Sequence, residues 1–565
     1  MKKNNYFDAI VIGSGISGGW AAKEFCEKGL KTLVLERGRD VKHIKDYPTA
    51  YLDPWQLEHT HQLSLKEREE NPIASKCYAY KEDAKHFFTS DDEQPYIQEK
   101  PFDWIRGYQV GGKSLTWAKQ TQRWSAYDFE GPARDGFAVD WPIRYADISP
   151  WYSYVEKFVG ISGNLDGIDA MPDGEFLPAW EMNQVELEIQ RNIQSKYSDR
   201  YVIAGRCAHL TKPKQIHIDQ GRTQCQARNL CQRGCPFGGY FSSNASTLPW
   251  AQKTGNLTLR PHSVVDSIIY DDQLGKAVGV RIIDSETNKS LEFYAKVIFV
   301  NASTIATNQI LLNSTSDRFP QGIGNDSGIL GKYIAFHNYL GSLSATFEGF
   351  EDSYYYGRRP TQPIIPNFRN VVRQEMDFLR GYASFFGAHR GRSPAVELED
   401  QVGGVYKDEL CTLGGWKVGM MMQGETIPQE KNHIRLSLDK KDKYGIPQVI
   451  TAIAYAENDF KSRNDFFQQG AEMLEAGGAK NILTHDSGQN PGLDIHEMGG
   501  ARMGLDPKTS ILNKWNQMHQ CPNVFVTDGA SMVSTGTQNP SLTYMALTAR
   551  AVNYAVAQMK KGSIK

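Results

Sequence analysis

The first forty residues carry a hydrophobic pattern that predicts a strand, a tight turn, a helix and a second strand. Residues 7–12 form an unbroken apolar run, as in a buried strand. Residues 19–28 repeat apolar side chains at helical spacing, and Gly29 ends that helix. Residues 32–36 are again mostly apolar and end on Glu36. This order predicts a βαβ unit built on a parallel sheet.

The turn before the predicted helix indicates a dinucleotide site. It reads Gly13, Ser14, Gly15, Ile16, Ser17 and Gly18, a G-x-G-x-x-G. Such a turn needs residues without a Cβ, because it bends tightly, approaches a pyrophosphate and packs a helix on a strand. The helix N-terminus favours phosphate charge, and Glu36 is placed to accept hydrogen bonds from a ribose. The alternative, a glycine loop used only for packing, leaves Glu36 unexplained.

Composition and charge narrow the class of protein. The chain has 565 residues, which predicts two to four structural units. The net charge is −2, and no basic run suggests a nucleic-acid surface. No apolar stretch reaches the ~18 residues of a membrane span. The N-terminus lacks the apolar region of a signal peptide, so we expect no export signal of the chain's own.

Several further stretches resemble the signatures of the glucose–methanol–choline (GMC) oxidoreductases. They are residues 106–117, 141–152, 296–303 and the C-terminal stretches 523–530 and 539–543. The resemblance implies an FAD cofactor, which Arg37 directly after Glu36 also favours. Beyond the glycine turn and Glu36, the cofactor-binding residues that it implies are Arg37, Arg106, Gly111, Gly112, Ser114, Trp117, Val265, Ala302, Asp528, Gly529, Asn539, Pro540 and Thr543. Some relatives link FAD covalently through a histidine where this chain has Thr116, so we expect noncovalent FAD.

Residues 496–504 resemble the family's H-x-x-G-x-x-x-M-G stretch and make His496 and Asn539 the candidate catalytic pair. Alcohol oxidation removes a hydroxyl proton together with a hydride, so a base must take the proton as the hydride leaves for the flavin. Imidazole suits this role because its pKa lies near working pH. The Asn539 amide holds the oxygen without titrating. The alternative for His496 is a structural histidine. We expect His337 to be structural or to support the site.

Three of the eight cysteines lie close together in the sequence, as Cys225, Cys231 and Cys235. Three thiolates match the three irons of a [3Fe–4S] centre, and the closing C-x3-C-P resembles bacterial ferredoxins. The same spacing occurs in a bacterial branch of the family, the catalytic subunits of FAD glucose dehydrogenases and their glycoside-oxidising relatives, which carry such a cluster. Zinc with His209 or His217, a disulfide, or unliganded thiols are the alternatives. A [4Fe–4S] centre would need a fourth ligand, for which Cys207 is the near candidate.

The predicted fold class is α/β, with a Rossmann-type FAD-binding domain and a substrate domain on a mainly antiparallel sheet. The FAD-binding domain combines residues 1–50, 95–125, 205–345 and 495–565. The substrate domain combines residues 126–204 and 346–494, with strands expected at 416–422 and 433–438. Residues 51–94 are an irregular excursion or lid. Residues 354–359 are either a sugar-stacking loop or an aromatic packing cluster.

The predicted function is a dehydrogenase that oxidises a secondary ring hydroxyl of a sugar or glycoside, with C3 as the preferred position. Electrons would leave singly through the iron–sulfur centre to a cytochrome c-type acceptor. Oxidation of glucose at C1, of another sugar or polyol, or an oxidase reaction with O2 are the alternatives, and a nonenzymatic flavoprotein is a third class. By resemblance, a small subunit that bears the signal would carry the folded chain to the periplasm. The alternative is the cytoplasm.

Overall fold

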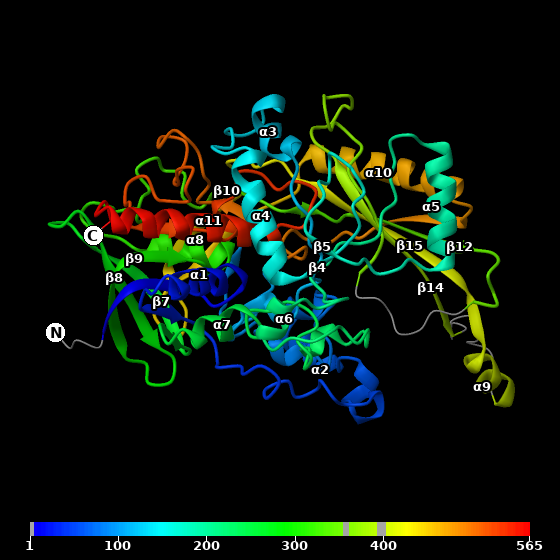
Figure 1. Ribbon diagram of the computed structural model, residues 1–565, viewed down its shortest axis with the longest axis horizontal. Helices are drawn as coiled ribbons and strands as arrows, with labels where there is room; N and C mark the ends of the chain where they lie inside the picture. Colours follow the sequence, from blue (N-terminus) through cyan, green and yellow to red (C-terminus); the bar gives the residue numbers. More distant parts are fainter. Residues whose placement is uncertain (1–4, 354–360, 393–402, 565) are drawn as a thin grey trace.

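The computed structural model describes residues 5–353, 361–392 and 403–564 (Figure 1). The aromatic stretch at 354–359 lies outside the described residues. The predicted N-terminal unit is confirmed: β1 (Tyr6–Ile12), α1 (Ile16–Glu27) and β2 (Thr32–Leu35) follow in that order. The two strands pair in parallel, and α1 begins directly after the glycine turn.

A seven-stranded sheet extends this unit. Its order is β6 (Leu257–Arg260), β2, β1, β9 (Ser290–Val300), β8 (Lys276–Asp284) and β7 (Ser263–Asp271), and β20 (Val524–Val526) also pairs with β9. The strands β6, β2, β1, β9 and β20 run parallel, whereas β7 and β8 are antiparallel additions. The sheet therefore draws together the N-terminus, the middle and the C-terminal part of the chain.

Alternating side chains of β1 fill the two faces of this sheet. Ala9 and Val11 join an apolar cluster with Phe25 of α1 and Val552 of α11 (Ser541–Lys560). Ile10 and Ile12 belong to the larger cluster on the other side. In Figure 1, α11 lies beside α1 and α4 (Tyr145–Val159), and both helices contact it. The 141–152 stretch thus runs into α4.

An antiparallel sheet forms the second large layer. Its order is β13 (Ile364–Ile365), β14 (Tyr382–Arg392), β15 (Leu413–Glu425), β12 (Gly341–Phe347) and β18 (Lys480–Asp486), and β11 (His337–Asn338) also pairs with β15. Side chains of one face, including Leu343 and Met420, pack on α10 (Glu457–Ala476). Their sequence neighbours Ser342 and Met421 line the main cavity. This period-two alternation makes the sheet the roof of the site.

A five-stranded sheet connects the two layers. Its order is β19 (Met498–Gly500), β10 (Lys332–Ala335), β16 (His433–Lys441), β17 (Pro447–Ala452) and β3 (Ile97–Gln98). The runs expected to be strands at 416–422 and 433–438 lie in β15 and β16. Strands β16 and β17 fall in the predicted substrate domain, yet they share this sheet with strands of the predicted FAD segments. The proposed domain boundaries stay a prediction.

The remaining elements are short. Residues 51–94 contain α2 (Leu65–Glu70) and brief 3-10 turns. The other helices and strands are α3 (Ala126–Asp135), α5 (Gln184–Lys196), α6 (Gln215–Asp219), α7 (Thr247–Lys253), α8 (Thr304–Asn313), α9 (Gly404–Cys411), β4 (Ile161–Ser162) and β5 (Phe176–Leu177). Within the described ranges, no helix has both the length and the apolar character that crossing a membrane requires.

Candidate active site

One large cavity separates the parallel sheet from its antiparallel roof. Its volume is about 1160 Å³, above the roughly 300–1,000 Å³ of ordinary small-molecule sites. The glycine turn, the ends of β2 and β9, the 106–117 loop and the segments around His496 and Asn539 all line it. The cavity therefore has room for a dinucleotide together with a substrate.

The glycine turn leaves an open cradle at the N-terminus of α1. Gly13 has φ +91°, and a Cβ there would meet the Asn301 carbonyl oxygen at 2.3 Å. A Cβ on Gly18 would meet the Gly13 carbonyl oxygen at 1.9 Å, so Gly18 serves helix–strand packing. A Cβ on Gly15 would meet no atom within 4 Å, because Gly15 faces the cavity. The cradle and the adjacent helix N-terminus suit a pyrophosphate.

Glu36 braces the same turn from the end of β2. Its carboxylate accepts hydrogen bonds from the Ser14 backbone N–H at 3.1 Å, the Ser14 hydroxyl at 2.5 Å and the Gly38 N–H at 3.0 Å. Burial raises the pKa of Glu36, and these hydrogen bonds oppose that shift. Glu36 also lines the cavity, so it keeps access to a ligand.

Most residues predicted to bind the cofactor line this cavity, and three do not. Those in its wall are Gly13, Ser14, Gly15, Ile16, Ser17, Glu36, Arg37, Arg106, Gly112, Ser114, Trp117, Val265, Ala302, Asp528, Gly529, Asn539 and Pro540. Gly18 packs as described. Gly111, with φ +91°, donates its N–H to the Ser14 hydroxyl at 2.9 Å. The Thr543 hydroxyl lies 2.8 Å from that of Tyr152 inside the core. These three support the cavity from behind.

Two histidines and an aspartate meet at the catalytic end of the cavity. One ring nitrogen of His337, one ring nitrogen of His496 and one carboxylate oxygen of Asp494 all lie within 4.8 Å of one another. The Nδ1 atoms of the two histidines are 2.8 Å apart. The Asp494 carboxylate accepts the backbone N–H groups of His337 at 3.0 Å and His496 at 3.2 Å. Burial lowers the pKa of His496 well below its ordinary value, so its imidazole is neutral and able to accept a proton.

Asn539 lines the same cavity from the segment before α11. Its backbone N–H donates to the Gln122 side chain at 3.2 Å. Its buried side-chain Oδ1 has no hydrogen-bond partner in the described part of the chain. An unpaired buried amide oxygen costs free energy unless a ligand completes it. This arrangement suits an amide that binds an incoming group.

Polar side chains line the cavity, and Tyr339 lies beside His496. The ring of Tyr339 lies 6.3 Å from that of His496, and its hydroxyl donates to Gln423. Gln423 in turn donates to the Thr537 carbonyl oxygen at 2.8 Å, which ties the roof to the Asn539 segment. Other polar lining residues are Gln120, Ser342, Gln362, Ser487 and Gln489. Such a wall offers many hydrogen-bond partners to a polyhydroxylated molecule.

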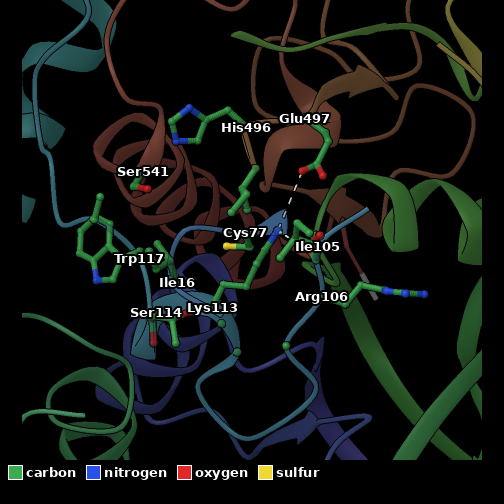
Figure 2. A pocket seen from close by; sticks show the side chains of 18 of the residues that line it. Ile16, Cys77, Ile105, Arg106, Lys113, Ser114, Trp117, His496, Glu497 and Ser541 are labelled. Carbon is green, nitrogen blue, oxygen red and sulfur yellow. Dashed lines mark hydrogen bonds and ion pairs between the residues drawn. The ribbon is translucent and has the colours of Figure 1, made fainter. Parts of the chain in front are cut away.

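A charged pair crosses the cavity between the 106–117 loop and the catalytic segment. Lys113 and Glu497 approach to 3.9 Å, as the dashed line in Figure 2 shows. His496 lies beside Glu497 in the chain and is seen above Lys113 in the same view, and Ile16 and Trp117 are seen below His496. The pair thus links two loops that are distant in sequence.

The three clustered cysteines line a second, small cavity together with His209 and Tyr240. All described cysteines are free thiols. Within the described ranges, Cys225, Cys231 and Cys235 do not converge to the 4.8 Å separation seen for the histidine group. One tetrahedral zinc, with Zn–S about 2.3 Å, needs sulfurs no more than ~4.6 Å apart. In this structure the three sulfurs are therefore not gathered around the position of a single tetrahedral ion.

Two buried cationic side chains adjoin this cysteine cavity. Lys119 is 1% exposed, and its Nζ lies 4.2 Å above the Tyr240 ring with no hydrogen-bond partner among the residues described. Burial lowers the pKa of Lys119 to about 8, and charge on the four nearby cysteines opposes that shift. Arg222 is equally buried and leaves Nη2 unpaired. A buried charge without a partner is costly, so the unpaired Lys119 ammonium favours an anionic group close to the cysteines.

The structure separates the other candidate ligands. His209 is fully buried, and its Nε2 lies 3.7 Å from the Cys231 sulfur. His217 is not available as a ligand, because its Nδ1 accepts from the Lys214 N–H at 3.0 Å and its Nε2 contacts the Lys157 carbonyl oxygen at 3.1 Å. The Cys207 sulfur lies 3.3 Å from the Ser162 hydroxyl and outside the small cavity.

The cysteine loop forms part of the wall of both cavities. Asn229, Leu230 and Cys231 line both the main cavity and the cysteine cavity. Arg233 in the same loop binds Asp83 at 2.5 Å and the Leu52 carbonyl oxygen at 2.8 Å. The excursion of residues 51–94 therefore anchors this wall.

Several site residues escaped the sequence interpretation. Lys119 and Tyr339 carry no motif. Asp494 was also missed, although its position two residues before His496 is a local signal that could have indicated it. His337 was expected to be structural or supporting, and the structure places it against His496.

Comparisons with known proteins agree with this geometry. Models of the GMC oxidoreductase family match residues 7–337 and 428–548. The chain is 28% identical to 2-methyl-1,2-propanediol dehydrogenase of Mycolicibacterium austroafricanum, over 97% of this chain and 94% of that protein. It is 26% identical to the fructose dehydrogenase large subunit of Gluconobacter japonicus, over 98% of each. The crystal structure of pyridoxine 4-oxidase from Mesorbium loti superposes with a TM-score of 0.60 at 15% identity, covering 97% of this chain and 99% of that one.

Proposed function

The chain belongs to the GMC oxidoreductase family, and from this premise we propose that it is an FAD-dependent dehydrogenase of a sugar or glycoside ring hydroxyl. The family membership confirms the predicted fold class, a Rossmann-type FAD-binding domain with a substrate domain. It also implies FAD and an oxidoreductase that acts on CH–OH groups. The observation that carries the proposal is the neutral His496 imidazole, which shares one cavity with the glycine cradle and the unpaired Asn539 amide.

The residues present fit FAD. The Gly15 cradle would hold the pyrophosphate, Glu36 the ribose, and the 106–117 loop with Ala302 and Asp528 the rest of the cofactor. FAD when bound supplies the acceptor for a hydride. His496 takes the hydroxyl proton of the substrate, and the Asn539 amide binds the substrate oxygen. With Thr116 in place of a linking histidine, the cofactor is held without a covalent bond.

The residues present also fit an iron–sulfur centre at Cys225, Cys231 and Cys235. Three thiols share one cavity, and the buried cations Lys119, whose Nζ is unpaired, and Arg222, whose Nη2 is unpaired, would balance the negative charge of thiolates and sulfides. Such a centre would carry electrons singly to a one-electron acceptor. Iron and acid-labile sulfide assays on purified protein test this assignment, and zinc without iron would overturn it.

The hydrogen-bonding wall around His496 supports a polyhydroxylated substrate, with the C3 hydroxyl of a glycoside as the proposed position. Product analysis with methyl glucoside tests the position, because its blocked C1 forbids anomeric oxidation. A 3-keto glycoside is the expected product. Oxidation of free glucose alone, to the lactone, would instead favour a C1 dehydrogenase.

An oxidase that passes the electrons to O2 is the second candidate. The two are separated by following reduced enzyme in air-saturated buffer. Slow reoxidation by O2 and fast reoxidation by a one-electron dye support the dehydrogenase, and the reverse supports the oxidase.

We further propose a protein partner and a location. The name of the relative from Gluconobacter japonicus describes a large subunit, which supports an assembly with at least one further subunit. The proposed partners are a small subunit that bears the export signal and a cytochrome c-type acceptor. Export of the folded chain with the signal-bearing subunit would place it in the periplasm. Fractionation of cells that express both subunits tests this location, and retention in the cytoplasm would contradict it.

A further inference from the structure

The contact between His337 and His496 joins two nitrogens of the same kind. Their Nδ1 atoms are 2.8 Å apart, which is a hydrogen-bond distance. In a neutral imidazole one nitrogen carries hydrogen and the other is an acceptor. One Nδ1 of the pair must therefore donate and the other accept. Which does which decides the nitrogen that His496 offers to the cavity.

The far side of His337 settles this choice. Its Nε2 lies 3.2 Å from the Thr535 carbonyl oxygen and 3.1 Å from the Gly536 carbonyl oxygen. Carbonyl oxygens only accept, so Nε2 carries the hydrogen. The His337 side chain is fully buried, which lowers its pKa to about 4 and keeps the ring neutral. The Nδ1 atom of His337 is therefore an acceptor.

The acceptor at His337 requires His496 to donate from Nδ1. A neutral His496 ring then has its lone pair on Nε2. The His496 ring lines the main cavity, and no described residue forms a hydrogen bond with its Nε2. The unprotonated nitrogen is thus the one available to substrate.

We propose that His337 is a positioning residue that fixes the tautomer of His496, so that Nε2 of His496 is the catalytic base. The inference rests on the proposed function, because it concerns the base of that reaction. A chain of hydrogen bonds runs from the Thr535 and Gly536 carbonyl oxygens through both rings to the cavity. In it a neutral histidine takes the place that a carboxylate holds in a Ser–His–Asp triad.

The proton balance of the step follows. The substrate O–H bond would break and its proton would move to His496 Nε2, while FAD, when bound, would supply the acceptor for the hydride that leaves the carbon as C=O forms. The His496 ring, now cationic, keeps its Nδ1–H bonded to His337 Nδ1. The same acceptor thus orients the neutral base and stabilises its charged product. The proton later leaves Nε2 for water.

Asp494 makes the pairing testable without moving the loops. Its carboxylate holds the backbone N–H groups of both histidines, and these bonds do not depend on the His337 side chain. Substitution at position 337 should therefore change the acceptor and leave the backbone in place.

The test compares His337→Leu with His337→Asn. Asparagine keeps an amide oxygen near the position of the imidazole Nδ1, whereas leucine offers no acceptor. Stopped-flow reduction of bound FAD by substrate should fall about 10- to 100-fold in His337→Leu, the loss typical when the partner that orients a functional histidine is removed. His337→Asn should recover most of it. In His337→Leu the solvent deuterium effect on flavin reduction should rise, because proton removal becomes limiting.

His217→Asn is the matched control. His217 is equally buried and uses both ring nitrogens away from the cavity, so this variant should lower the melting temperature and keep the reduction rate. Equal losses in His337→Leu and His337→Asn, or wild-type reduction in His337→Leu with FAD bound, would overturn the inference. If His496→Ala itself reduces FAD normally, the proposed base fails rather than its positioning alone.

Discussion

At the catalytic end of the cavity the two histidines pair their own ring nitrogens, whereas several buried nitrogens beside the cysteines are left without partners in the described chain. His337 has both ring nitrogens bonded within the chain, and His496 has one. Beside the cysteines, Lys119 Nζ, Arg222 Nη2 and His209 Nδ1 have no hydrogen-bond partner among the residues described. Buried polar groups are normally satisfied, so the histidine pair is complete as folded, whereas the group beside the cysteines is built around something further. The two ends of the cavity should therefore respond differently to mutation.

The largest expected effect is at the complete end. His496→Ala should slow flavin reduction by about 10²–10⁴-fold, because general base catalysis is lost. Its FAD and iron contents should stay near wild type, since the glycine cradle and the cysteines lie elsewhere. Stopped-flow absorbance measures the rate. Near wild-type reduction with FAD fully bound would show that His496 is not the catalytic base.

Cys231→Ser should impair the cysteine site and leave the catalytic end of the cavity intact. We expect iron to be lost and electron transfer to a one-electron dye to slow, while the first reduction of FAD by substrate proceeds. Metal analysis and dye kinetics check both halves. Cys411→Ser is the matched control, because Cys411 is exposed and remote in sequence from the loop. Normal dye reduction by iron-free Cys231→Ser would mean that electrons leave by another route.

Asn539→Ala sharpens the contrast within the catalytic end. Flavin reduction should fall only about 2- to 10-fold, the effect of one neutral hydrogen bond, because water can replace the amide. The substrate concentration for half-maximal reduction should rise at the same time. A loss as large as that of His496→Ala would give Asn539 a role in proton removal that an amide cannot fill.

Lys119→Met should have a different measurable effect in iron-free protein and in protein that holds iron. In iron-free protein, removal of a buried unpaired charge should stabilise the fold by about 1–4 kcal/mol. In protein that holds iron, the same change should shift the reduction potential of the centre to more negative values. Denaturant unfolding and an electron paramagnetic resonance titration measure the two effects. If this substitution destabilises iron-free protein instead, Lys119 is not an unpaired charge in the folded chain.

The smallest expected effect is that of pH on the base. The pKa of His496 is lowered by burial, and the neutral ring is the active form. The rate of flavin reduction should therefore stay level from about pH 8 down to the ordinary histidine pKa of roughly 6.5, and decline only in more acidic buffer as the ring is protonated. A decline centred near pH 6.5 would show that water reaches His496 freely.

The sequence predicted those parts of the site that depend on local spacing. The βαβ unit, the glycine turn and the resemblance around His496 each lie within one short stretch, and the structure brings them to one cavity. The partners of these residues were not predictable in the same way. His337 owes its role to the Thr535 and Gly536 carbonyl oxygens, about two hundred residues away in the chain.

Burial accounts for the other differences. Sequence spacing made His209 and His217 equal candidates for a metal ligand near the cysteines. Only the fold shows that both ring nitrogens of His217 contact backbone groups. Thr543 stands next to residues that line the cavity, yet the turn into α11 directs its hydroxyl to Tyr152. Lys119 shows no pattern at all, since a lone lysine in a sequence carries no mark of being buried.

The wall formed by Asn229, Leu230 and Cys231 has a practical consequence for anyone who redesigns this enzyme. The same three residues line the main cavity and the cysteine cavity. A substitution that widens this loop to enlarge the main cavity therefore also alters the surroundings of the cysteines. Variants selected for a bulkier substrate should accordingly be assayed at the cysteine site as well.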